Sequence, residues 1–200
     1  MRKFLFYFVL FTISVNYSQE KDDLFDLIND DEKEIELLPK RMIFTQSVLW
    51  GKNGLLRKTG LAPLNIENRQ KELKIRKSML TAHQAIGYLT LASMIAQGII
   101  GGRLYNGDES LRSTHNTMGK VVNIGYFTGA GLSLFSPPPL INKKKSKGFD
   151  SIKAHKILAT IHFSAMVATN HYKHRDKKIH KASAYTAFAS YATAVIVLKF

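Results

Sequence analysis

The 200-residue chain contains no cysteine. This absence excludes disulfides, thiolate catalysis and the cysteine-ligated sites of zinc and iron–sulfur clusters. It also excludes a haem linked covalently to the chain, because that linkage requires a C-x-x-C-H motif. The sequence has no phosphate-binding P-loop, no G-x-S-x-G and no H-E-x-x-H motif either. Histidine is therefore the obvious residue to hold a metal or cofactor.

Acidic residues are scarce outside one short stretch. The chain has 29 lysines and arginines against 15 aspartates and glutamates, which gives a net charge of +14. Nine of the acids fall within residues 20–36, so residues 37–200 carry 25 bases and six acids, a net charge of +19. Such a balance suits nucleic acid or an anionic membrane surface. The bases stand in loops beside apolar segments, which favours the membrane.

Residues 1–18 have the pattern of a secretory signal peptide. Arg2 and Lys3 form a positive start, an apolar stretch follows, and small residues precede Gln19. A signal of this kind predicts that residues 19–78 lie outside the cytoplasm and that the protein is exported to a membrane, most simply the inner membrane of a bacterium. An exported protein is not expected to bind nucleic acid.

Residues 19–78 form an arm of mixed character. The arm is acidic at first and becomes amphipathic over residues 37–60, and we expect it to be partly helical and partly irregular. Trp50 fits either an anchor at the membrane interface or a helix packed on a soluble domain. Residues 66–78 are strongly charged and predict a helix that leads into the first apolar segment.

Four apolar segments follow the arm and predict an all-α, membrane-spanning four-helix bundle over residues 79–200. The second is expected to end at Pro137-Pro138-Pro139, which cannot continue a helix. A crossing needs about 20 apolar residues. The third and fourth segments are shorter and would use flanking lysines and tyrosines that reach the surface, so a soluble helical bundle is the alternative. The segments are residues 79–102, 117–136, 154–170 and 182–198.

Four histidines, one opening each segment, share a second feature. Each is followed four residues later by a small residue, which lies on the same helix face and leaves a cleared patch of backbone beside the imidazole. A flat macrocycle with axial histidine ligands needs such a patch. The four motifs are His83 with Gly87, His115 with Gly119, His155 with Ala159, and His180 with Ala184.

The alternating direction of the segments then predicts two pairs of histidines. His83 and His155 would share one end of the bundle, and His115 and His180 the other. Each pair could supply both axial ligands of a haem, an arrangement that favours electron transfer because no coordination position stays open. The alternative is that these are ordinary histidines at the membrane interface, without a ligand.

Other polar residues fall within the apolar segments. His162 follows His155 by seven residues, two helical turns or about 10 Å along the axis. An ionisable residue at membrane depth suggests a function, so His162 is either an alternative haem ligand or a hydrogen-bonded group of the interior. Gln97, Asn123 and Thr160 are further candidates for buried polar groups.

The histidine pattern over residues 79–198 resembles the four-helix core of the cytochrome b561 superfamily. This resemblance implies that His83 and His155 bind an outer haem b and that His115 and His180 bind an inner one. It also implies electron transfer across a membrane, from a small reductant or quinol to an acceptor that is unknown here. The chain departs from the family because it lacks the additional outer helices of eukaryotic members and a preceding DOMON-like β domain.

A second hypothesis needs no cofactor. A membrane protein of this organisation could serve as a scaffold or as a subunit of an envelope complex, with a partner protein bound through residues 19–60. A colourless protein that co-purifies with others would favour this hypothesis.

Overall fold

In the computed structural model, the structure describes residues 36–139 and 150–199. All the regular secondary structure in these residues is helical, which confirms the all-α prediction for this part of the chain. The predicted signal peptide (1–18) and the acidic residues 19–35 of the arm lie outside the described residues.

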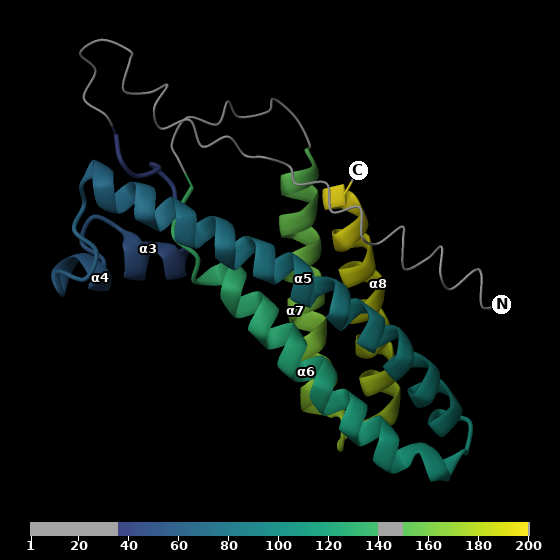
Figure 1. Ribbon diagram of the computed structural model, residues 1–200. Coiled ribbons are helices and arrows are strands. Elements are labelled where there is room, and N and C mark those ends of the chain that lie inside the picture. Colours follow the sequence, from purple (N-terminus) through teal and green to yellow (C-terminus); the bar gives the residue numbers. More distant parts are fainter. Residues whose placement is uncertain (1–35, 140–149, 200) are drawn as a thin grey trace. The chain divides into compact units, whose positions relative to one another are not determined.

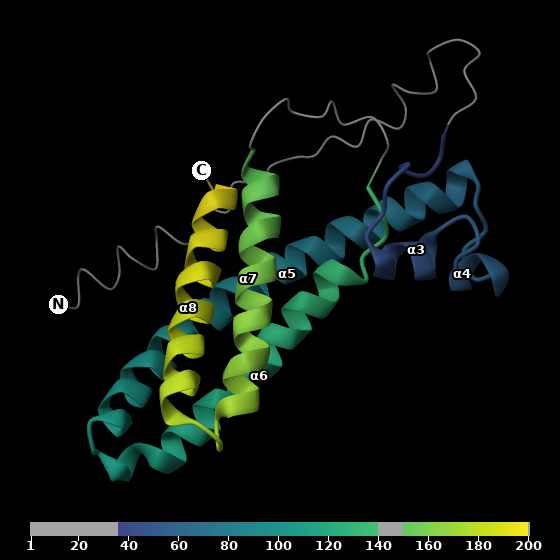
Figure 2. The ribbon, with the colours of Figure 1, turned by 180° about the vertical axis from the view of Figure 1, so that it is seen from behind.

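Two helical hairpins make up most of the fold (Figures 1 and 2). Helices α5 and α6 form the first, and helices α7 and α8, which cross it at an angle, form the second. The hairpins contact each other mainly through α5 and α8. The helices are α3 (Phe44–Trp50), α4 (Leu55–Lys58), α5 (Ile66–Tyr105), α6 (Arg112–Leu134), α7 (Ser151–Tyr172) and α8 (Lys177–Lys199), with a short 3-10 turn, η1 (Glu109–Leu111), before α6.

The helix boundaries follow from local sequence. Asn65, Asp150 and Asp176 precede α5, α7 and α8, and each accepts a hydrogen bond from the backbone N–H three residues later, at 2.9, 2.8 and 3.0 Å respectively. Side-chain caps of this type satisfy N–H groups that the first helical turn leaves free. Helix α6 ends at Leu134, shortly before the three prolines that were predicted to stop it.

The turn between α5 and α6 is held by local charges. Gly107 adopts a φ of 105°, which favours glycine. The Ser110 hydroxyl, followed by the Arg103 guanidinium, lowers the pKa of Asp108. The carboxylate therefore stays ionised, and paired with Arg103 at 2.8 Å, in mildly acidic solution.

The helices differ in how well they suit a membrane crossing. Among the described helices, α5 alone is long and apolar enough to cross by length and composition. Helices α6, α7 and α8 have 23, 22 and 23 residues, and a rise of about 1.5 Å per residue makes each of them long enough for a hydrocarbon core of about 30 Å. Helices α7 and α8 also extend beyond the predicted segments 154–170 and 182–198 at both ends. All three helices are therefore long enough to cross a membrane, and it is their polar residues that make them less suited to a crossing than α5.

Apolar and polar side chains are distributed unusually in the two hairpins. Large aliphatic side chains point outward from all four helices, and Leu89 and Ile124 are each 70% exposed. The apolar core is small and lies where the hairpins cross. It comprises Met94, Val122, Tyr126, Ala165, Met166 and Ala187, with Phe188 and Tyr191 packed against it. Partly buried polar side chains, among them histidines, Gln97 and Asn123, lie between the helices beyond this core.

Helices α5 and α6 approach each other closely at two glycines. A Cβ atom at Gly125 would lie 2.6 Å from Oγ1 of Thr90, and one at Gly101 would lie 2.9 Å from Cε1 of His115. Neither distance is possible for real atoms without a shift. These glycines therefore set the spacing of the first hairpin, as small residues do between membrane helices.

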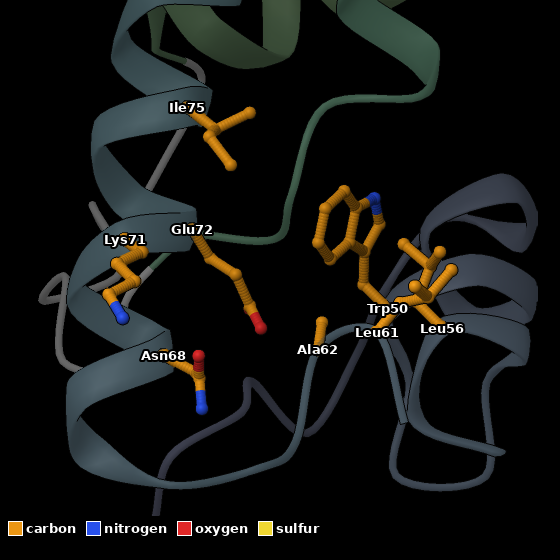
Figure 3. A pocket seen from close by; sticks show the side chains of 8 residues that line it. All are labelled: Trp50, Leu56, Leu61, Ala62, Asn68, Lys71, Glu72 and Ile75. Carbon is orange, nitrogen blue, oxygen red and sulfur yellow. The ribbon is translucent and has the colours of Figure 1, made fainter. Parts of the chain in front are cut away.

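The described part of the arm packs on the start of α5 and the segment after α6. The indole N–H of Trp50 donates to the carbonyl of Phe135 at 3.0 Å. A shallow groove of about 230 Å³ lies between Trp50 and the α5 residues Glu72 and Ile75 (Figure 3). The Trp50 side chain itself is therefore packed on protein.

A buried ion cluster fastens this packing. The Glu72 carboxylate is shared by Arg57 and Arg69, and all three side chains are at most 5% exposed. Arg69 also donates to the carbonyls of Leu37, at 2.9 Å, and Pro138, at 3.1 Å. One cluster thus joins the arm, α5 and the segment that follows α6. Sequence reasoning missed it, because charged residues in a helical lead-in are usually solvated.

Candidate functional site: two histidine pairs

The structure places His83 and His155 at the same end of the bundle. The Nδ1 atom of His83, on α5, donates to the carbonyl of Gly129 on α6 at 2.8 Å. The Nδ1 atom of His155, on α7, donates to the carbonyl of Ala194 on α8 at 3.2 Å. The two rings interact electrostatically with each other across the interior. Each hairpin thus contributes one imidazole, which its own second helix holds in place.

His115 and His180 lie toward the other end, near the two hairpin turns. Their ring centroids are 6.3 Å apart, with the ring planes 80° to each other. The Nδ1 atom of His180, on α8, donates to the carbonyl of Thr169 on α7 at 2.9 Å. The amide nitrogen of Gln97, on α5, lies 3.1 Å from Nδ1 and 3.3 Å from Nε2 of His115, on α6. Again each hairpin supplies one ring.

These contacts fix the tautomer of three of the rings. A backbone carbonyl can only accept a hydrogen bond, so Nδ1 of His83, His155 and His180 must carry the proton. Their Nε2 atoms are then free to act as lone-pair donors when the rings are neutral. An Nδ1–H bound to a carbonyl is the usual second-shell arrangement of a metal-ligating imidazole, because it orients the ring and leaves the other nitrogen for the metal.

The separation of the pairs can be followed along α7. His155, His162 and Thr169 are spaced at seven-residue intervals, about 10 Å each. The His115/His180 pair is bonded at the level of Thr169, which puts the two pairs about 20 Å apart along the bundle. His162 lies midway.

His162 belongs to a central group of rings. Its Nδ1 atom is 2.6 Å from the hydroxyl oxygen of Tyr126, and its ring centroid is 5.0 Å from that of Tyr191. It also interacts electrostatically with His155 and His83. His162 is thus a hydrogen-bonded group of the interior, which is one of its two predicted roles. Sequence reasoning missed both tyrosines, although Tyr126 and Tyr191 each lie in a predicted apolar segment.

Side chains cover two of the predicted cleared patches. The Tyr191 hydroxyl donates to the carbonyl of Gly87 at 3.3 Å and lies over that glycine. The amide of Gln97 lies over Gly119, 3.3 Å from the position of a Cβ atom. A macrocycle that used the patch beside Gly87 would displace the Tyr191 hydroxyl, and one that used the patch beside Gly119 would require the Gln97 amide to shift while it keeps its contact with His115.

Of the three other predicted polar groups, two contact polar side chains of a neighbouring helix and one does not. Gln97 lies against His115, and Asn123 accepts a hydrogen bond from Asn170 at 2.7 Å between α6 and α7. The prediction for Thr160 is wrong, because this residue is exposed and its hydroxyl donates to the Lys156 carbonyl of its own helix at 3.0 Å. Helix α7 turns this position away from its neighbours.

The described residues contain no cluster of three or more histidine or acidic side chains that could hold a metal ion. Each histidine pair thus offers two imidazole side chains. Comparisons of the chain with protein-family models, with curated proteins and with solved structures found no match.

Proposed function

We propose that residues 66–199 form a membrane-embedded four-helix domain that binds two haem b groups and carries electrons between the two faces of the membrane. His83 and His155 would hold one haem, and His115 and His180 the other. The observation that carries the proposal is the pairing of imidazoles from opposite hairpins, with carbonyl-bound Nδ1 atoms on three of the four.

The donor set suits haem iron. Metal–imidazole distances are about 2 Å, so two imidazoles on one metal bring their ring centroids to about 6 Å of each other. The 6.3 Å between the centroids of His115 and His180 agrees with this separation. His115 and His180 would hold the haem through neutral imidazole nitrogens, and the bound group would supply reversible one-electron chemistry.

The distribution of side chains supports a bilayer as the solvent. A protein of this size in water rarely exposes large contiguous apolar surface, yet large aliphatic side chains are exposed on all four helices of the hairpins. The interior instead holds imidazole, phenol, amide and hydroxyl groups, which need partners when lipid surrounds the bundle. This supports four crossings in place of the single one that composition identifies.

The competing function is a cofactor-free membrane scaffold. One observation favours it, namely that Tyr191 and Gln97 already cover the backbone beside Gly87 and Gly119. In that case the histidines would serve only to bond the helices of each hairpin together.

An absorption spectrum of the purified protein from haem-replete cells separates the two functions. We expect a reduced-minus-oxidised difference spectrum with b-type bands and about two haems per chain. Replacing His83 or His155 by alanine should remove one haem and spare the other, because each pair binds independently. The exposed His171, which contacts Arg175 in the turn after α7, provides the control, and His171→Ala should retain both haems. A protein without a haem band would rule out the electron carrier.

A further inference from the structure

The arm carries apolar side chains on the side that faces away from the protein. Phe44 is 82% exposed and Leu61 is 76% exposed, and three further large apolar residues of the arm are exposed as well. We call these residues the arm face: Ile43, Phe44, Val48, Leu55 and Leu61.

Helix α3 has exposed apolar side chains on one side and protein contacts on the other. Phe44 and Val48 are four residues apart and therefore share one side of the helix. The opposite side contacts the protein, where Gln46 is buried, the Thr45 hydroxyl donates to the Leu134 carbonyl, and Trp50 donates to Phe135. The helix is thus held in place by polar contacts while its apolar side chains point outward, the reverse of a helix that packs on a soluble domain.

The charge of the arm indicates what covers this face. Residues 36–65 contain five bases and a single acid, Glu36. Arg57 is used inside the ion cluster, but Lys52 and Lys58 flank the exposed Leu55 and are themselves exposed. An apolar face bordered by bases matches the boundary between acyl chains and anionic headgroups.

The position of the arm agrees with this occupant. Its ion cluster is anchored at Arg69 and Glu72, in the first two turns of α5, the helix that composition identifies as able to cross a membrane. We propose that the arm face lies in the headgroup region of an anionic leaflet, so that the described part of the arm lies on the membrane surface. This inference does not use the histidine pairs, and a colourless protein would leave it intact.

The absence of cysteine makes the test direct. Nitroxide labels on Phe44→Cys, Val48→Cys and Leu61→Cys variants of the full chain would be compared in vesicles with a label on Asn53→Cys, an exposed polar position of the same arm. Oxygen concentrates in the bilayer and a nickel chelate stays in water. We expect collisions with oxygen to dominate at positions 44, 48 and 61, and collisions with nickel at position 53. Trp50, the only tryptophan, reports whether each variant keeps the arm docked.

Three outcomes would overturn the proposal. Labels at 44 and 61 that collide mainly with nickel would place the arm face in water, and labels shielded from both reagents would indicate a protein partner or a second copy. The third outcome concerns charge. Oxygen access to the labels should rise when phosphatidylglycerol is added to phosphatidylcholine vesicles. A Lys52→Gln/Lys58→Gln double variant should lose this rise. Equal access in the two lipids would overturn the anionic assignment.

Discussion

At the scale of single residues, His115 differs from the other paired histidines in its partner. The other three donate from Nδ1 to a backbone carbonyl, whereas His115 meets the amide of Gln97. Within the described part of the chain, Oε1 of Gln97 is buried without a hydrogen-bond partner. The Gln97 Nε2 atom also donates to the backbone carbonyl of His115 at 3.1 Å, so this one side chain contacts both the ring and the backbone of His115.

Gln97→Leu should therefore weaken one haem site selectively. Loss of a group that orients a ligand typically costs about 10- to 100-fold in metal affinity. We expect a loss of this size for the His115/His180 haem and none for the His83/His155 haem, measured by haem titration of the apoprotein. Thr186→Val is the matched control, because the Thr186 hydroxyl bonds only within its own helix, to Ala182. Equal weakening of both sites would show that Gln97 acts through general stability.

Glu72 provides a second prediction at this scale. Glu72→Gln leaves Arg57 and Arg69 buried with no negative partner, and breaking a buried ion pair costs about 3–5 kcal/mol. The arm should then undock from α5, which a red shift of Trp50 emission and faster proteolysis within residues 40–58 would detect. Glu67→Gln is the control, since its pair with Lys71 on the same helix is exposed and should not matter. Unchanged emission in Glu72→Gln would show that other contacts hold the arm.

At the scale of helices, two glycines of the first hairpin have opposite expected effects. A Cβ atom at Gly125 would collide with the buried Thr90, whereas one at Gly98 meets no atom within 4 Å. Gly125→Ala should destabilise by about 1–3 kcal/mol through overpacking. Gly98→Ala should stabilise by about 0.5–1 kcal/mol, because glycine is unfavourable inside a helix. Thermal loss of helical circular dichroism in detergent measures both, and a stabilised Gly125→Ala protein would contradict the close approach of α5 and α6.

The helices also show what sequence can and cannot supply. Local rules predicted the continuous lead-in from Ile66 and the stop before Pro137, because caps and prolines act on their own segment. The alternating helix directions predicted that His115 and His180 would share one end of the bundle, where their ring centroids lie 6.3 Å apart. The partners of the four paired histidines could not be predicted. The acceptors at Gly129 and Ala194 are backbone carbonyls, which no residue type marks in the sequence. The contact between Glu72 and Arg57 depends on how the arm packs on α5.

At the scale of the whole molecule, the fold predicts a definite topology. The α5–α6 and α7–α8 turns lie at the same end in both views (Figures 1 and 2). If all four helices cross the membrane, cysteines introduced at Asn106 and Arg175 should react with an impermeant thiol reagent from one side, and a cysteine at Asn53 from the other. Intact and permeabilised spheroplasts would distinguish the sides. Labelling of Asn106 and Arg175 from opposite sides would exclude the four-crossing arrangement.

The division of the paired histidines between the hairpins has one more consequence if they hold haem. Each of the four paired imidazoles contacts the other helix of its own hairpin, yet each pair draws one ring from either hairpin. Each hairpin therefore holds one imidazole of each pair in position by its own contacts, and a haem bound between the two imidazoles of a pair would join the two hairpins. Fragments 1–139 and 150–200 expressed together should associate more tightly when haem is supplied than when its synthesis is blocked, so that cofactor delivery would control assembly of the bundle.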